Sequence, residues 1–275
     1  MTGTANQVPT IQLPGGVAMP QLGLGTWELR GDECERAVRF AIEVGYRHID
    51  TAEGYGNEDA VGRGIRGVDR ESLFITSKVW RSRLGRSDLV AVCENSLREL
   101  GTEYLDLLLV HWPNSDIPIG ETVEGFMDLR QAGKIRAWGV SNFTESHLRE
   151  TVAHHTPATN QVELHPFFNQ RQLSAVCRDL GVPVTAYSPL ARGRVAADPT
   201  IRGIADSHGV TPAQVAVRWA IQHGYAVIPK SADPGRMRSN LNVFGFQLSG
   251  QEITAIDALP QGDRLVDGSW SEFHR

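Results

Sequence analysis

An aspartate and a tyrosine lie close together in the segment GYRHIDTAEGYGNEDAVG, residues 45–62, and both side chains suit acid catalysis. Residues 47–50 are expected to form a short buried strand that ends at Asp50. Tyr55 follows on a glycine-flanked loop, ahead of a helix that begins near Glu58. A carboxylate at a strand end and a phenol on the next loop can serve as two parts of an acid catalyst. Taken alone, such a pair is more often a helix-capping aspartate and a surface tyrosine, so the rest of the chain must decide.

Polar side chains also stand at the ends of other apolar segments along the chain. With Asp50, they are Lys78, His111, Ser141, Asn142, Gln161, Tyr187 and Lys230. One polar residue at a strand end says little, because Lys and Asp often end strands at a surface. A set on nearly every strand is hard to explain by solvation, and in a parallel barrel these ends meet at one mouth. The sequence therefore indicates a site at that mouth.

Tyr55 and three of these residues suit the reduction of a carbonyl group. A protonated Lys78 beside Tyr55 is expected to favour the phenolate and lower the pKa of Tyr55. A cation about 4 Å away supplies roughly 4 kcal/mol at an effective dielectric near 20, whereas a shift of about two pKa units needs only about 2.7 kcal/mol. Asp50 would hold Lys78 charged and in place. Tyr55 could then donate a proton to the carbonyl oxygen, and His111 could hydrogen-bond the same oxygen.

Strands and helices are expected to alternate along the chain. The predicted strands are residues 22–27, 47–50, 73–78, 105–110, 137–140, 159–164, 183–187 and 226–229. They are continuous apolar runs, as expected of strands that are buried on both faces. Repeated strand–helix units predict one α/β domain over residues 1–275, a (β/α)8 TIM barrel with an N-terminal β-hairpin and extra C-terminal helices. A doubly wound sheet would fit the alternation, but it usually carries fewer strands in this length.

The predicted helices follow the strands closely. They are residues 34–44, 58–65, 88–100, 123–132, 144–153, 170–180, 199–208, 211–222, 236–241 and 249–258, and the hairpin is residues 10–13 and 17–19. Ser87 or Asp88 is expected to cap the third of these helices, and Thr211 the eighth. Gly62 to Gly67 matches G-x-G-x-x-G, but it lies at the end of a helix, whereas the dinucleotide motif follows a strand and opens a helix. We interpret these glycines as a helix end and turn.

The composition narrows the class of protein. The 275 residues are 41% hydrophobic and 21% charged, with a formal net charge of −5. Basic residues are scattered, which argues against a general nucleic-acid surface. The N-terminus does not resemble a signal peptide, and no apolar run approaches the ~20 residues that span a bilayer. The three cysteines, Cys34, Cys93 and Cys177, are far apart, so we expect buried free thiols in a reducing cytoplasm.

Two pairs of residues are candidate metal ligands. They are His48 with Asp50, and Glu163 with His165. A position in the middle of a strand favours packing for His48, and the neighbouring Pro166 favours a structural role for the second pair. We therefore predict no metal site, and a metal-dependent barrel hydrolase is the less favoured reading.

The chain resembles the aldo-keto reductases over nearly its whole length. The matching segments are LGLGTW, GYRHIDTAEGYGNE, FITSKVW, DLLLVHWP, GKIRAWGVSNF, NQVELHPFF, AYSPLARG, TPAQVAVRWAIQ and IPKS. It is most similar to the bacterial branch of 2,5-diketo-gluconate and methylglyoxal reductase-type members. The resemblance implies a (β/α)8 barrel that binds NADPH without a Rossmann motif and reduces aldehydes and ketones. It also implies that Asp50, Tyr55, Lys78 and His111 form the catalytic tetrad, with Tyr55 as the general acid.

The resemblance further implies which residues bind NADPH. They are Thr26 and Trp27 near the ribose, Ser141, Asn142 and Gln161 at the carboxamide, Tyr187 on the nicotinamide ring, Ser188, Leu190 and Gly193 at the pyrophosphate, Lys230, Ser231 and Arg236 at the 2′-phosphate, and Asn240 at the adenine. Asp50 is counted among the cofactor-binding residues as well. Two cations and a hydroxyl suit a phosphate, so NADPH is predicted over NADH. Ser239 stands where many members have Glu, which bears on the adenine contacts and on the strength of this preference.

A small-molecule carbonyl substrate is expected at the mouth of the barrel. Its predicted contacts are Trp27, Trp80, His111 and Trp112, although each tryptophan could instead be plain barrel packing. The segment 114–120 is short compared with many members and predicts an open mouth. The tail, residues 264–270, is expected either to cover the mouth or to be loosely ordered.

The resemblance also implies a monomer, since family members are usually monomeric. A rival reading is a regulatory protein that keeps the barrel and cofactor site with incidental turnover, as in relatives of potassium-channel β-subunits. The four intact residues Asp50, Tyr55, Lys78 and His111 argue against that reading.

Overall fold

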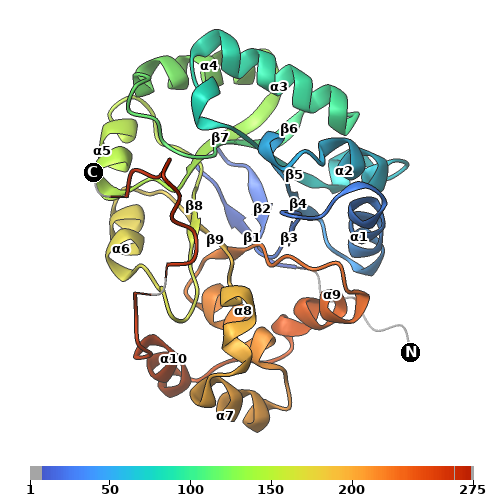
Figure 1. Ribbon diagram of the computed structural model, residues 1–275, viewed down its shortest axis with the longest axis vertical. Helices are drawn as coiled ribbons and strands as arrows, with labels where there is room; N and C mark the ends of the chain where they lie inside the picture. The colour runs from blue at the N-terminus through green and yellow to red at the C-terminus, as the bar shows by residue number, and fades with distance from the viewer. Residues whose placement is uncertain (1–7, 263, 274–275) are drawn as a thin grey trace.

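Eight parallel strands form one sheet that curls into a barrel, with helices around its outside (Figure 1). The computed structural model describes residues 8–262 and 264–273. The strands are β3 Leu24–Gly25, β4 His48–Asp50, β5 Phe74–Val79, β6 Leu105–Val110, β7 Ile135–Ser141, β8 Asn160–Glu163, β9 Val184–Tyr187 and β10 Ala226–Val227. They pair in chain order, and bridges from Leu22 to Val227 and from Gly25 to Lys230 join the first strand to the last. The predicted (β/α)8 barrel is confirmed.

Helices cover the outer face of the sheet. They are α1 Gly31–Val44, α2 Glu58–Ile65, α3 Arg86–Leu100, α4 Ile119–Gln131, α5 Glu145–Val152, α6 Arg171–Asp179, α7 Pro199–His208, α8 Pro212–Gln222, α9 Pro234–Leu241 and α10 Gly250–Asp257. Short 3-10 helices lie between them, among them η1 Glu53–Tyr55, η2 Arg70–Ser72 and η3 Arg81–Arg83. In α1 the side chains of Ala37, Val38 and Ala41 face the core, which is the spacing of one helix face.

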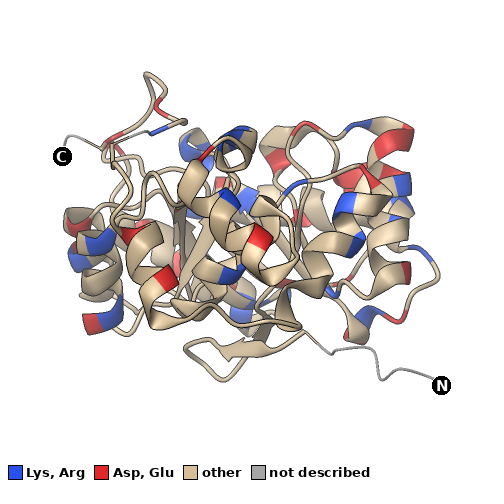
Figure 2. Ribbon diagram, turned by 90° about the horizontal axis from the view of Figure 1, so that it is seen from below, with Lys and Arg blue, Asp and Glu red and all other residues tan. Residues whose placement is uncertain are grey.

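The predicted N-terminal hairpin closes one end of the barrel. Strands β1 Thr10–Gln12 and β2 Ala18–Pro20 pair antiparallel. Leu13 and Met19 pack against Phe74, Leu107 and Leu109, which belong to barrel strands. Figure 2 shows this hairpin and the C-terminal tail at opposite ends of the molecule. The hairpin thus lies at the amino ends of the strands, and the carboxyl ends are left to the loops.

The glycines of the G-x-G-x-x-G match serve helix packing. A Cβ at Gly62 would lie 2.7 Å from the carbonyl oxygen of Glu99, and one at Gly64 would lie 2.7 Å from Cβ of Val38. Real Cβ atoms do not approach other atoms so closely, so α2 can lie against α1 and α3 only with glycine at both positions. The interpretation as the end of a helix is confirmed, although both glycines lie inside the last turns of α2.

The predicted cap of α3 was wrong. The helix begins at Arg86, two residues before the predicted start, and its N-cap Gly85 has no side-chain cap. The carboxylate of Glu121 on α4 instead accepts a hydrogen bond from the backbone N–H of Arg86 at 3.1 Å. A carboxylate of a neighbouring helix therefore satisfies one free amide at the start of α3, where a side-chain cap by Ser87 or Asp88 was expected. Thr211 caps α8 as predicted, through the backbone N–H of Gln214.

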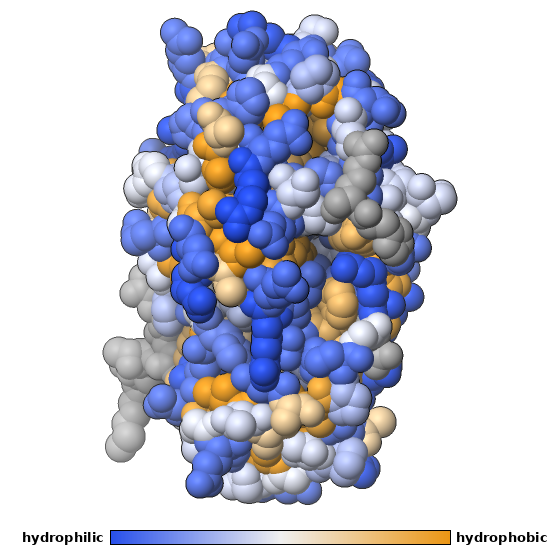
Figure 3. All heavy atoms as spheres, turned by 90° about the vertical axis from the view of Figure 1, so that its left-hand side faces the viewer, coloured by the Kyte–Doolittle hydropathy of each residue, from blue (hydrophilic) through white to orange (hydrophobic). Residues whose placement is uncertain are grey.

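The surface carries charges of both signs. Figure 2 shows Lys and Arg interspersed with Asp and Glu over the helices. On the face that carries α5 and α6, apolar side chains show as separate patches between hydrophilic ones (Figure 3). Among the described helices, none is both long and apolar enough to cross a bilayer.

The three cysteines are buried free thiols, as predicted. Burial raises the pKa of Cys34 and of Cys93 to about 12 and that of Cys177 to about 11. Because the thiolate is the reactive form of cysteine, these side chains behave as small core residues.

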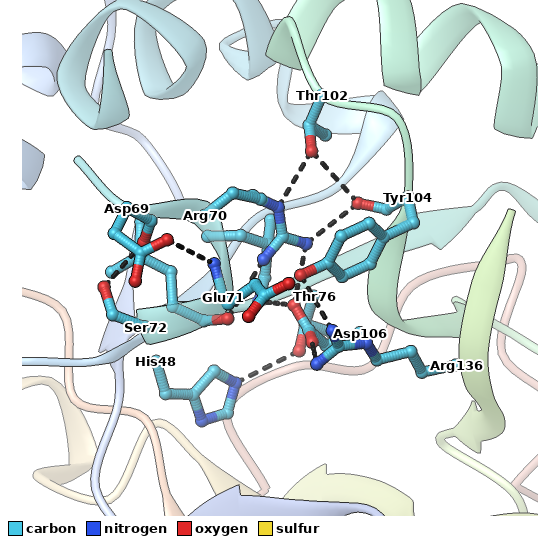
Figure 4. A network of polar contacts seen from close by, with 12 residues as sticks. His48, Asp69, Arg70, Glu71, Ser72, Thr76, Thr102, Tyr104, Asp106 and Arg136 are labelled. Carbon is cyan, nitrogen blue, oxygen red and sulfur yellow. Dashed lines mark hydrogen bonds and ion pairs between the residues drawn. The ribbon is translucent and has the colours of Figure 1, made fainter. Parts of the chain in front are cut away.

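A buried carboxylate on β6 joins several elements near the amino ends of the strands (Figure 4). Asp106 accepts hydrogen bonds from Arg70 at 2.7 Å, from Arg136 at 3.1 Å and from the backbone N–H of Ile75 at 2.9 Å. Both guanidinium groups also lie over the ring of Tyr104, at 4.0 and 4.3 Å from its centroid. A single carboxylate thus ties η2, β5 and β7 to β6.

Replacing this carboxylate should destabilise the fold. In Asp106→Ala, Arg70 and the backbone N–H of Ile75 lose a buried acceptor, and we expect the free energy of unfolding to fall by about 3–5 kcal/mol. Urea denaturation followed by circular dichroism measures this change. Asp128→Ala is the matched control, because Asp128 pairs with Arg86 on the exposed surface and should change stability little. Equal losses in the two variants would contradict a special role for Asp106.

Candidate active site

A cavity of about 370 Å³ opens at the carboxyl ends of the strands. Most residues that the sequence placed at the mouth line it: Thr26, Trp27, Asp50, Tyr55, Trp80, His111, Trp112, Ser141, Asn142, Gln161, Tyr187, Ser188 and Lys230. Lining residues that the sequence did not assign to the site are Gly25, Gly54 and Ile228, whereas Val266 and Trp270 belong to the tail that was expected either to cover the mouth or to be loosely ordered. The polar residues at the strand ends therefore predicted most of the cavity lining. The parts that come from loops and from the tail do not lie at strand ends, so this pattern could not predict them.

A buried ion pair lies beneath the cavity. Lys78 donates to Asp50 at 2.5 Å, to the carbonyl oxygen of Thr51 at 2.8 Å and to the Tyr55 hydroxyl at 3.3 Å. The register of β4 against β5 pairs Asp50 with Thr76, so Lys78 lies two residues further along, on the same face of its strand. The turn η1 ends at Gly56, which has φ 61°, and it brings Tyr55 over the lysine.

The ionisation of this group departs in part from the sequence expectation. Burial raises the pKa of Tyr55; the charge of Lys78 lowers it and Asp50 raises it, so the net shift is upward. The prediction of a lowered pKa was wrong, because it counted the cation and left out the desolvation of a buried phenolate. For Lys78, burial lowers the pKa, but Asp50 and Tyr55 outweigh burial and the pKa stays above its usual value.

His111 lies at the end of β6 with its ring against two aromatic residues. The ring centroids of Tyr55 and Trp80 are 5.5 and 5.3 Å from that of His111, both edge-on. Burial lowers the pKa of His111 well below its usual value, and the charge of Lys78 adds to this effect. The imidazole is therefore neutral at neutral pH and can donate one hydrogen bond.

Amide and hydroxyl side chains form a network along one wall of the cavity. Gln161 donates to the second carboxylate oxygen of Asp50 at 2.7 Å. Asn142 donates to the carbonyl oxygen of His111 at 3.0 Å, and its own side-chain oxygen accepts from the Tyr187 hydroxyl at 2.8 Å. The predicted cofactor residues are thus bonded directly to the predicted catalytic residues.

Backbone strain is concentrated around the cavity. Six described residues other than glycine have a positive φ: Glu28, Asn142, Gln170, Ser188, Ala191 and Arg192. Asn142 and Ser188 line the cavity, and Glu28 and Arg192 lie on loops beside it. Residues other than glycine hold this conformation at a cost of about 1–3 kcal/mol each, and such residues cluster at functional sites.

Most of the residues predicted for the phosphate and adenine groups lie away from the lining, although Ser188 and Lys230 belong to it. Leu190, Gly193, Ser231, Arg236 and Asn240 do not line the cavity, and Lys78 lies beneath it. Arg236 reaches the Ser231 hydroxyl at 3.5 Å, which brings two of the three predicted phosphate contacts together. Lys230, the third, faces Glu28 at 3.7 Å. Asn240 is buried and hydrogen-bonds the Tyr46 hydroxyl, so its contact with adenine stays a prediction.

The outer wall of the cavity is aromatic, and the tail completes it. Trp270 lies 6.1 Å from Trp80 and 6.3 Å from Trp112, measured between ring centroids. Val266 and Trp270 both line the cavity, which supports the expectation that the tail covers the mouth. The open mouth predicted from the short segment 114–120 is therefore partly closed by a distant part of the chain.

The side chains of the two candidate metal-ligand pairs form hydrogen bonds within the protein. His48 is buried and bonds the Thr76 hydroxyl at 3.1 Å. Glu163 and His165 bond each other at 3.0 Å. Over residues 8–262 and 264–273, no group of three or more His, Cys, Asp and Glu side chains is placed to hold a metal ion.

The fold and the site define a (β/α)8-barrel protein with a buried Asp–Lys–Tyr group under a polar, aromatic-walled cavity. Residues 21–261 match the model of the Aldo/keto reductase family, and the chain belongs to this family.

Three similar proteins illustrate the relationship. An aldo-keto reductase of Mycolicibacterium smegmatis is 47% identical over 262 residues, covering 94% of this chain and 95% of the relative. The 2,5-diketo-D-gluconic acid reductase B of a Corynebacterium species is 45% identical over 267 residues, covering 95% and 96%. The crystal structure of a Bombyx mori aldo-keto reductase in complex with NADP superposes with a TM-score of 0.90 at 38% identity and covers 96% of each chain.

Removing only one charge of the Asp50–Lys78 ion pair should lower the free energy of unfolding by more than expected from the loss of both charges. In Lys78→Met the carboxylate of Asp50 stays buried without its cation, and we expect a loss of about 3–5 kcal/mol in the free energy of unfolding. The double variant Asp50→Asn/Lys78→Met should lose less than the sum of the two single variants, because no charge is left unpaired. Urea denaturation of the four proteins measures the coupling. Strict additivity would contradict a direct interaction.

Proposed function

We propose that the chain reduces aldehydes and ketones, in particular small carbonyl and dicarbonyl compounds, to alcohols with NADPH. The observation that supports this most is Lys78, which bonds both Asp50 and Tyr55 directly beneath the cavity. The proposal includes a single barrel domain that acts as a cytoplasmic monomer, in line with the family.

The side chains around the cavity suit the chemistry of NADPH. Amides and a hydroxyl from Ser141, Asn142 and Gln161 match a carboxamide, which both donates and accepts hydrogen bonds. The ring of Tyr187 offers a flat face for the nicotinamide. Lys230, Ser231 and Arg236 would hold the 2′-phosphate, because two cations and a hydroxyl match its charge. When bound, NADPH supplies the hydride that reduces the carbonyl carbon.

The proton is proposed to come from Tyr55. Its raised pKa keeps the phenol protonated at neutral pH, so the proton is available to the carbonyl oxygen. As the proton leaves, Lys78 lies 3.3 Å from the oxygen and stabilises the phenolate, and Asp50 keeps the lysine charged. Neutral His111 would hydrogen-bond and orient the carbonyl oxygen through its remaining N–H. Because its pKa is well below the usual value, the ring is not an imidazolium at neutral pH and does not serve as the acid.

Removing the phenolic hydroxyl tests the proposed acid. In Tyr55→Phe, kcat for NADPH oxidation with methylglyoxal should fall by about 10²–10⁴-fold, which is the usual contribution of a general acid. The dissociation constant of NADPH, followed by quenching of tryptophan fluorescence, should stay unchanged. Tyr104→Phe is the control, because it removes a hydroxyl near the opposite end of the barrel. Unchanged turnover in Tyr55→Phe would exclude the acid role, and cofactor binding without turnover in the native protein would favour the regulatory alternative.

A second variant tests the proposed 2′-phosphate contact. Arg236→Ala should raise the dissociation constant of NADPH by roughly ten- to a hundredfold and leave that of NADH nearly unchanged, since only NADPH carries the phosphate. Arg238→Ala is the matched control on the same helix, where the guanidinium lies 4.6 Å from the ring centroid of Phe40. Equal weakening of both cofactors by Arg236→Ala would argue against this contact.

A further inference from the structure

A strained turn follows β3 at the edge of the cavity. The backbone N–H of Leu29 donates a hydrogen bond to the carbonyl oxygen of Thr26 at 3.0 Å and closes a β-turn over these four residues. Glu28 is the third residue of the turn and has φ 66°. Glycine or asparagine is usual at such a position, and glutamate holds it only at a cost in free energy. The contacts of the Glu28 side chain are therefore the place to look for a functional reason.

The buried side chain of Asn57 fixes this turn in place. Its amide nitrogen donates to the carbonyl oxygens of Thr26 and Leu29, both at 2.9 Å. Its oxygen accepts a hydrogen bond from the Thr51 hydroxyl at 2.7 Å. The turn is thus tied to the segment after β4, and the exposed side chain of Glu28 extends from a backbone that is held on both sides.

The carboxylate of Glu28 faces one of the two cations predicted to hold the 2′-phosphate. It lies 3.7 Å from Nζ of Lys230, and both side chains are exposed. A bridge between Gly25 and Lys230 keeps the two backbone segments side by side. Within the described part of the chain, no carboxylate pairs with Arg236, the second predicted cation, which bonds the Ser231 hydroxyl. Glu28 therefore neutralises Lys230 and leaves Arg236 available.

The same turn also meets the segment predicted to bind the pyrophosphate. The guanidinium carbon of Arg192 lies 5.7 Å from the ring centroid of Trp27. Arg192 belongs to the 3-10 helix η4, Ala191–Ala196, which includes Gly193 and follows Leu190. One turn thus contacts both elements predicted to bind cofactor phosphates, and its single carboxylate lies among their cations.

We propose that Glu28 moderates the preference for NADPH over NADH, because its carboxylate is the counter-ion of Lys230 that the 2′-phosphate must displace. A phosphate monoester carries roughly 1.5 to 2 negative charges at neutral pH, so NADPH needs the full charge of Lys230. NADH carries a hydroxyl at the same position and leaves the ion pair closed. This inference rests on the proposed function and adds a residue that opposes binding of the 2′-phosphate.

Cofactor binding to a charge variant tests this role. Glu28→Gln keeps the size of the side chain and frees Lys230, so the dissociation constant of NADPH should fall about three- to tenfold. That of NADH should stay within about twofold. Quenching of tryptophan fluorescence measures both constants without turnover. Unchanged or weaker binding of NADPH, or equal tightening of both cofactors, would overturn the proposal.

Glu43→Gln is the matched control for the change in net charge. Glu43 is exposed near the end of α1, which leads into the amino end of β4, away from the cavity. Both dissociation constants should stay within about twofold of the native values in this variant. A tightening of NADPH as large as in Glu28→Gln would show an effect of overall charge and contradict a specific role for Glu28.

A double variant tests whether Glu28 acts through Lys230. Adding Glu28→Gln to Lys230→Met should change the dissociation constant of NADPH by less than about twofold, because the cation that Glu28 neutralises is already absent. The same tightening in the Lys230→Met background as in the native background would contradict action through Lys230.

The thermal midpoint of Glu28→Gly separates a functional reason for the strained residue from a structural one. Glycine adopts a positive φ without strain, so the midpoint, followed by circular dichroism, should be at or above the native value while NADPH binds more tightly. A lower midpoint would contradict a functional reason for glutamate in this turn.

Two outcomes distinguish this inference from the function on which it rests. A native protein that does not bind NADPH would overturn the proposed function and this inference together. Equal dissociation constants of NADPH in the native protein and in Glu28→Gln would overturn this inference alone.

Discussion

The buried ion pair between Asp50 and Lys78 is the constraint on which the site depends. Two charges without water are tolerated only when their remaining hydrogen-bonding atoms have partners. Gln161 from β8 satisfies the second oxygen of Asp50, and Thr51 and Tyr55 satisfy the lysine. These bonds fix β4, β5 and β8 relative to one another, so the stability of the barrel and the geometry of the candidate active site rest on the same atoms.

The amino ends of the barrel strands contribute mainly to stability, and the carboxyl ends carry the candidate active site. At the amino ends, Asp106 and the hairpin are held by ion pairs and apolar packing. At the carboxyl ends, the loops hold Asn142 and Ser188 in left-handed conformations that cost free energy. The ion pairs and apolar packing at the amino ends can offset this cost, because all eight strands connect the two ends.

Much of the fold could be predicted because it depends on local patterns. The eight strands are continuous apolar runs bounded by polar residues, so they were found within a few positions. The start of α3 was missed because its cap comes from Glu121 on another helix. The hydrogen bonds from the tail to Glu163 were missed because the donors, the backbone N–H groups of Leu265 and Val266, are about a hundred residues away in the chain. The net pKa of Tyr55 was mispredicted, since burial cannot be read from spacing.

The burial of the cysteines bears on how the protein withstands reactive carbonyl compounds. Reactive aldehydes and dicarbonyls modify exposed thiolates, and a protein proposed to turn them over meets them at every cycle. Cys34, Cys93 and Cys177 lie in the core, and burial raises the pKa of each. In the native fold, therefore, these thiols are protected from such compounds. Chemical modification of the three cysteines is expected only when the chain unfolds.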